Sequence, residues 1–283
     1  MVGAPRVRND NRPTDPAKRM KLFDLAIAVL LALPAAASEL RDFCADRPGL
    51  DTPACTVDRG HLQLEVGVGD WTHDRTAAEE SDDVRFGDAQ LRYGVSDAIE
   101  ARLGWTAYGF ERSRDRFTGE IDRSDGAGDV SFGLKANLLH PDGRDLSVAV
   151  LPYALAPTGK RPIGTGDWGG GVLVPISLPL FARFELALTP ELDAAVDQDG
   201  RGRHLAAGGA AGVDLDLFER VSVGAEVSAI RDRDPGGHST QALLGLSAAW
   251  RPCGDWQLDL GSNLGLDRES PDVEVYAGIA KRF

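Results

Sequence analysis

The chain has 283 residues, of which 42% are hydrophobic, and its formal net charge is −13 with an isoelectric point near 4.8. This acidic balance argues against a nucleic-acid-binding protein, because a phosphate-binding face needs a basic patch. The mean hydropathy of −0.21 is typical of a soluble protein, but it is also compatible with a β-barrel, whose lumen and loops are polar.

The N-terminus has the features of a secretory signal. Basic residues near Met20 precede an apolar run at 25–33, and the small residues at 34–38 resemble a cleavage site. The run is too short to cross a bilayer comfortably as a helix. We therefore predict that residues 1–38 are a signal peptide; the polar stretch 1–19 indicates an N-terminal extension before a start at Met20, and a start at Met1 stays open.

The three cysteines bear on the segment that follows. In an exported protein, Cys44 and Cys55 are predicted to form a disulfide around a short stretch that contains proline and glycine. Sequence alone does not fix the pairing, and Cys253 is left over as a free thiol. We predict that residues 39–59 form a periplasmic segment ahead of the main domain.

From residue 60 onward, hydrophobic and polar side chains alternate in a series of short segments. A repeat of two residues indicates β-strands rather than helices. The alternating segments are 62–69, 88–95, 99–106, 130–138, 172–178, 184–188, 205–217, 221–229, 242–250, 256–266 and 273–283. The stretch between 145 and 180 is less regular, because its prolines cannot donate hydrogen bonds to a strand ladder.

The connections between these segments alternate between short and long. Tight turns are predicted at 95–97, 178–180, 217–220 and 251–255, with a slightly longer turn at 140–143. Charged loops are predicted at 70–83, 111–128, 158–167, 196–203 and 231–239. Outer-membrane barrels have short periplasmic turns and longer external loops. We therefore predict an all-β fold, a transmembrane antiparallel up-and-down β-barrel of about twelve strands over residues 60–283, surrounded by lipid in the bacterial outer membrane.

The last strand and the aromatic residues support this prediction. Residues 273–283 end on Phe283, which is similar to the closing strand of outer-membrane barrels and implies recognition by the outer-membrane assembly machinery. Aromatic residues fall near both ends of the strands, as in interfacial girdles, although aromatic residues also prefer strands in general. They are Trp71, Tyr108, Phe110 and Trp168 at the long-loop end, and Tyr93, Phe181, Phe218, Trp250, Trp256 and Phe283 at the short-turn end.

Several glycine- and proline-rich stretches resemble a known family. These stretches are 46–49, 55–57, 60–67, 151–159, 169–175 and 190–191. They look like the outer-membrane transporters grouped as the meta-pathway phenol-degradation family. The resemblance implies a barrel that takes up or exports small, often aromatic, compounds, but it brings no set of functional residues.

The polar faces of the predicted strands define a candidate lumen. In a barrel, alternate residues point inward. The predicted lumen-lining residues are Glu65, Asp88, Gln90, Arg92, Glu100, Arg102, Lys135, Arg183, Glu185, Asp214, Asp216, Glu226, Asp259, Glu274 and Arg282. They indicate either a polar, mildly cation-preferring pore or ion pairs that fill a narrow barrel.

Other motifs predict no cofactor or metal site. Residues 164–169 fit G-x-G-x-x-G, but the strand-like run that follows indicates a loop rather than a dinucleotide site. Residues 197–200 resemble part of a calcium loop and lack the Glu of an EF-hand, although a loosely held divalent ion at the acidic loops stays open. No histidine has the spacing of a zinc site.

The predicted function is passive or facilitated passage of a small solute across the outer membrane. The protein is not predicted to be an enzyme. One alternative is an outer-membrane hydrolase that uses His238 and Ser239, which would also need an orienting group and an oxyanion site. Another is a non-conducting structural barrel.

Overall fold

The computed structural model describes residues 40–181 and 183–283, so the predicted signal peptide lies outside the described residues. No helix among the described residues is long and apolar enough to cross a membrane. The strands are β1 (Leu62–Arg75), β2 (Glu79–Ser96), β3 (Ile99–Asp115), β4 (Ile121–Gly126), β5 (Val130–Leu139), β6 (Ser147–Ala156), β7 (Gly169–Leu173), β8 (Ile176–Phe181), β9 (Phe184–Val196), β10 (Arg203–Phe218), β11 (Val221–Asp234), β12 (Gly237–Cys253), β13 (Trp256–Gly265) and β14 (Val273–Arg282).

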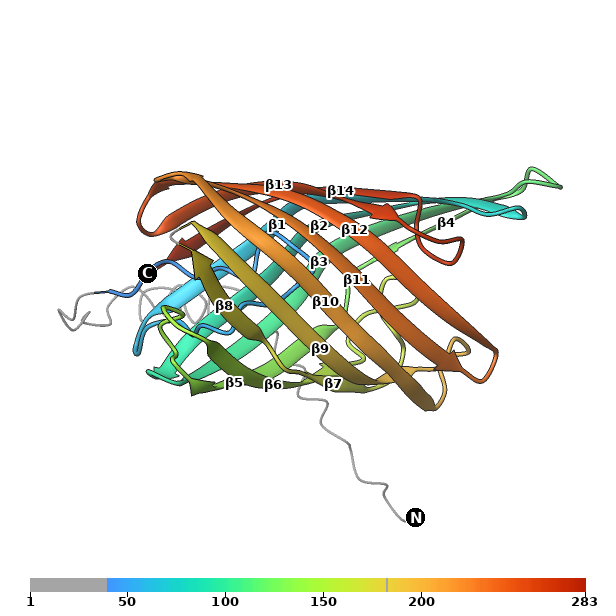
Figure 1. Cartoon of the computed structure of the whole chain (residues 1–283). Helices are drawn as coiled ribbons and strands as arrows, with labels where there is room; N and C mark the ends of the chain where they lie inside the picture. The colour runs from blue at the N-terminus through green and yellow to red at the C-terminus, as the bar shows by residue number, and fades with distance from the viewer. Residues whose placement is uncertain (1–39, 182) are drawn as a thin grey trace, which may run out of the picture. The chain divides into compact units, whose positions relative to one another are not determined.

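The strands form one closed antiparallel sheet (Figure 1). The β9–β10 pairing continues the sheet on one side, and β14 pairs with β1 on the other. The last residue takes part in the closure, because Phe283 N donates to Leu62 O over 2.7 Å and Leu62 N donates to Phe283 O over 3.4 Å. A closed sheet leaves no edge strand unpaired.

Two barrel strands are interrupted, so fourteen segments make twelve barrel strands. β4 and β5 both pair with β3, and β7 and β8 both lie between β6 and β9. The second break falls at Pro175, which has no N–H to donate, while its carbonyl still accepts a hydrogen bond from Ala149 N at 2.8 Å. The predicted all-β barrel of about twelve strands is confirmed.

The distribution of side chains is the reverse of that in a soluble protein. Val68, Phe132 and Leu260 are exposed, whereas Arg92 and Lys135 are fully buried. Apolar side chains in such an outward band are covered by lipid, and the polar groups turn inward. The protein is therefore a membrane barrel of the outer-membrane type, and all the predicted girdle aromatics except the half-buried Phe110 are exposed on it.

Three of the predicted loops are wrong, because most of their residues continue the strands, and the turn predicted at 178–180 is wrong, because these residues lie within β8. The stretch 70–83 belongs to β1 and β2 apart from a turn at 76–78, and 231–239 is a hairpin with a turn at 235–236. The stretch 111–128 likewise contains the end of β3 and all of β4, and this hairpin reaches past the rim of the barrel (Figure 1). Alternating charges can pair across antiparallel strands in water, as Arg112 and Asp82 do at 3.5 Å.

Candidate functional site

The barrel lumen contains the N-terminal part of the described chain, residues 40–58, which we name the plug segment. Its backbone amides bond to inward-facing side chains. Val57 N donates to Glu100 Oε2 at 2.8 Å, and Thr52 N donates to Thr189 Oγ1 at 3.0 Å. Residues 40–58 of the segment predicted at 39–59 therefore contact inward-facing side chains of the barrel wall. Buried polar side chains need hydrogen-bond partners, and an irregular chain with free amide groups supplies them.

A disulfide gives the plug segment a closed loop. Cys44 and Cys55 are joined, whereas Cys253 is free and exposed at the end of β12. Within the loop, the amides of Leu50 and Asp51 both donate to the Glu226 carboxylate on β11, the second over 3.0 Å. The closed loop is thus bound to β11, on the side of the barrel away from β1–β3, and the plug segment also contacts β1–β3.

An ionic cluster fixes the plug segment against β1, β2, β3 and β5. The Asp46 carboxylate lies 3.1 Å from Arg92 Nη1 and 3.5 Å from Lys135 Nζ, and it also pairs with Arg102. Arg92 in turn pairs with Glu65 at 2.7 Å and with Glu100 at 2.8 Å. The side chains of Arg92, Glu100 and Lys135 are fully buried.

The charges in this ionic cluster balance only when the plug segment is in place. Three cations, Arg92, Arg102 and Lys135, face the barrel carboxylates Glu65 and Glu100, and Asp46 supplies the third negative charge. An unpaired charge in a buried site is costly. The electrostatics therefore favour the plugged state.

Two cavities formed by the described residues lie in the lumen, one on each side of the plug segment. The inner cavity has a volume of about 830 Å³ and opens among the short turns, and the outer cavity has a volume of about 480 Å³. Asp46, Arg47 and Asp51 line both of them. The plug segment thus separates the two cavities.

Apolar and polar side chains both line the outer cavity. Leu151, Leu155 and Leu173 from β6 and β7 are apolar lining residues, which we name the leucine wall, whereas Gln90 and Arg102 are polar lining residues, and Arg102 lies close to Leu151 beside Gly133. Tyr153 also lines this cavity, and its hydroxyl donates to Asp193 Oδ1 at 2.7 Å. A ligand in this space would meet both aliphatic side chains and charged groups.

The predicted lumen residues fall into three groups. Nine contact the plug segment, namely Glu65, Gln90, Arg92, Glu100, Arg102, Lys135, Glu226, Asp259 and Arg282. Arg183, Glu185, Asp214 and Asp216 line the inner cavity, and Asp88 lines the outer one. Glu274 accepts a hydrogen bond from Asn263 Nδ2 at 2.8 Å.

The sequence analysis did not identify the residues of the plug segment that contact these lumen residues. Asp46, Arg47 and Asp51 do not belong to an alternating segment, so periodicity gives no sign of where they lie. The available signal was the pair Cys44 and Cys55, which indicates a constrained loop. It does not indicate that the loop docks inside the barrel.

Asp51 makes plug docking sensitive to pH. Burial, together with the carboxylates of Glu226, Asp214 and Glu185, raises the pKa of Asp51 from 3.8 to about 8, and Asp51 Oδ2 is buried without a hydrogen-bond partner. The docked state therefore holds a proton that a solvated Asp51 has lost. The stabilisation of the docked plug segment by this proton is complete below about pH 4 and is lost as the pH rises through 8.

We expect the plug segment to undock more often as the pH rises from 5 to 8. Single-channel recording of the open fraction across this range measures the effect, and Asp51→Asn should flatten the pH profile. Asp42→Asn, at an exposed position of the same segment, should keep the wild-type profile. An unchanged profile in Asp51→Asn would contradict the prediction.

The other sequence motifs lie outside this site. The glycine-rich stretch 164–169 leads into β7 rather than a helix, and Asp129 holds it by accepting a hydrogen bond from Thr165 N at 2.7 Å. His238 and Ser239 are consecutive residues of β12. Consecutive strand residues point to opposite faces, so this pair does not provide a nucleophile next to its base.

Comparison with solved structures gives the same fold. A crystal structure of an outer membrane channel from Pseudomonas putida F1 is 13% identical, with a TM-score of 0.63 over 81% of this chain and 98% of that chain. The transport unit of the autotransporter AIDA-I from Escherichia coli is 9% identical, with a TM-score of 0.51 over 95% and 99% of the two chains. Neither is described as an enzyme.

Comparison at the sequence level identifies the family. No curated protein sequence matches the chain. A family model described as "Putative MetA-pathway of phenol degradation" matches residues 45–283, which include most of the plug segment and the whole barrel. The chain belongs to this family of the MetA pathway of phenol degradation.

Proposed function

We propose that the protein is an outer-membrane channel for small solutes that combine an apolar body with a polar group, and that the plug segment controls their passage. The outer cavity carries this proposal. Its volume of about 480 Å³ lies in the range of small-molecule sites. Its leucine wall suits an aromatic ring or a short aliphatic chain, and the polar residues Gln90 and Arg102 that line the same cavity suit a carboxylate or hydroxyl group.

The family and the fold support a transport role. The matched family is named for phenol degradation, and the Pseudomonas putida protein of the same fold is described as an outer membrane channel. The described residues offer no paired nucleophile and base at His238 and Ser239, so the hydrolase alternative gains no support from the geometry.

Proteoliposome swelling tests the proposal with two solutes of similar charge. We expect 4-hydroxybenzoate to enter faster than gluconate, because only the aromatic acid matches the leucine wall. Leu155→Ser should reduce this preference severalfold, since the substitution puts a hydroxyl group in the leucine wall. Leu146→Ser, at an exposed position in the turn before β6, is the matched control and should preserve the preference. Equal entry of both acids would contradict the proposed selectivity, and no entry of any solute would favour the structural barrel.

A further inference from the structure

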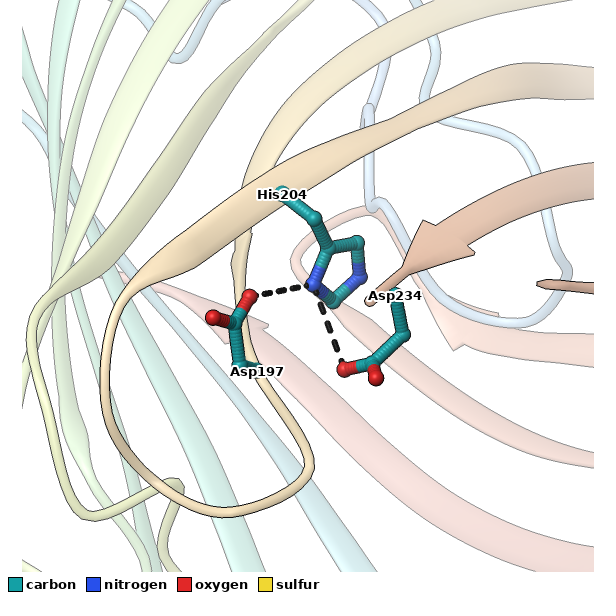
Figure 2. A group of neighbouring side chains, drawn as sticks. All are labelled: Asp197, His204 and Asp234. Carbon is teal, nitrogen blue, oxygen red and sulfur yellow. Dashed lines mark hydrogen bonds and ion pairs between the residues drawn. The ribbon is translucent and has the colours of Figure 1, made fainter. Parts of the chain in front are cut away.

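A second polar cluster lies at the long-loop end of the barrel and does not involve the plug segment. Figure 2 shows His204 between Asp197 and Asp234, with Nδ1 at 2.9 Å from Asp197 Oδ1 and at 3.4 Å from Asp234 Oδ2. On the other side of the ring, Nε2 lies 2.8 Å from Asp232 Oδ1. Both nitrogens of one imidazole therefore face carboxylates.

His204 and Asp234 are buried in this cluster, so the charge on the imidazole ring affects the stability of the folded protein. The side chain of His204 is only 5% exposed, and that of Asp234 only 4%. A neutral imidazole has one N–H and one lone pair, so in the neutral ring one lone pair would point at an anion. His204 Nε2 is also buried without an aligned hydrogen bond. The ring therefore matches its surroundings only when it carries a positive charge, either as a second proton or as a bound metal ion.

The geometry around Nδ1 favours a metal ion over a proton. An N–H bond is directional and serves one acceptor well, but Nδ1 faces two carboxylates. One ligand atom from each of Asp197, His204 and Asp234 lies within 4.8 Å of the others, so a single ion can contact all three. The Asp234 carboxylate is held in place, because its Oδ2 accepts from Gln198 N at 2.7 Å and its Oδ1 from Gly236 N at 2.6 Å.

We propose that Asp197, His204 and Asp234 bind a divalent transition-metal ion of the zinc type. One imidazole nitrogen with carboxylate oxygens is a ligand set that zinc accepts. Asp232 sits where the second ring nitrogen of a metal-bound histidine usually donates its proton, an arrangement that orients the ligand. Asp197 and His204 belong to the β9–β10 hairpin, whereas Asp234 ends β11, so the spacing along the sequence predicted no zinc site.

A metal ion at this site would connect two neighbouring hairpins at the outer mouth of the barrel. Asp197 lies in the β9–β10 turn, His204 lies at the start of β10, and Asp234 ends β11. A bound ion therefore ties the turn at 197–202 to the β11–β12 hairpin. His204 shares its face of β10 with the buried Ala206, so it points to the lumen side of the barrel wall. The metal site braces the outer mouth of the barrel.

Zinc titration of the folded, untagged barrel in detergent tests the proposal, with a chromophoric chelator as competitor. We expect one Zn²⁺ per chain, an affinity at least tenfold lower in His204→Ala, and a loss of about 10–100-fold in Asp232→Asn. His73→Ala is the matched control, because His73 on the β1–β2 hairpin pairs with a single carboxylate, Asp82, at 2.9 Å. It should bind zinc like the wild type.

A second measurement keeps the test valid if His204→Ala does not fold. Trypsin cleavage after Arg201, in the turn that the ion would brace, should slow when Zn²⁺ is added to the wild type and should not slow in Asp197→Asn. Absence of stoichiometric zinc binding would overturn the proposal and identify the cluster as a protonated histidine held by carboxylates. Equal affinity in wild type and His204→Ala would overturn it as well.

Discussion

Asp46→Asn should open the channel. The substitution removes one of three negative charges from the ionic cluster and leaves Arg92, Arg102 and Lys135 facing only Glu65 and Glu100. Breaking a buried ion pair by removing one partner costs about 3–5 kcal/mol. In the undocked state the residue at position 46 is hydrated, so most of this cost falls on the docked plug segment.

The expected effect is large enough to see in single-channel recordings. About 3 kcal/mol of lost docking free energy corresponds to roughly a hundredfold shift toward the undocked state, and the open fraction should rise accordingly. Asp42→Asn is the matched control, because it makes the same chemical change in the same segment at an exposed position outside the ionic cluster. If the two variants conduct alike, the ionic cluster does not hold the plug segment.

Arg92→Met should destabilise the whole barrel rather than only the docked plug segment. Arg92 is fully buried, and it bonds to Glu65, Glu100 and Asp46 and to the Cys44 carbonyl. Glu65 and Glu100 both belong to the barrel wall, and without Arg92 they lose the cation that pairs with both of them. This loss remains when the plug segment has left the barrel. We expect a loss of about 3–5 kcal/mol in the free energy of unfolding.

Urea titration of the barrel in lipid vesicles, followed by tryptophan fluorescence, measures this loss. Arg85→Met is the matched control on the same strand. Arg85 pairs with Asp83 at 3.0 Å, but its side chain is 47% exposed, and an exposed pair contributes about 0–1 kcal/mol. A similar midpoint for the two variants would show that burial of the ionic cluster adds nothing to barrel stability.

The charged hairpins show which features of the fold a local sequence pattern can predict and which it cannot. The stretches 70–83 and 231–239 are rich in charge, so they were predicted as loops, yet they continue β1, β2, β11 and β12. Charge distinguishes residues in water from residues in lipid. It does not distinguish a loop from a strand that extends past the membrane, because pairing across the hairpin decides that.

The sequence by itself determined the barrel. Alternation along each segment specifies which side chains meet lipid and which turn inward, and this requires only neighbours in the chain. Only the tertiary structure decided what fills the lumen and what gathers at its mouth. Asp46 meets Arg102 across 56 positions, and His204 at the start of β10 meets Asp234 at the end of β11. Such contacts depend on how the closed sheet curves and where the plug segment enters it, and neither is encoded in a local period.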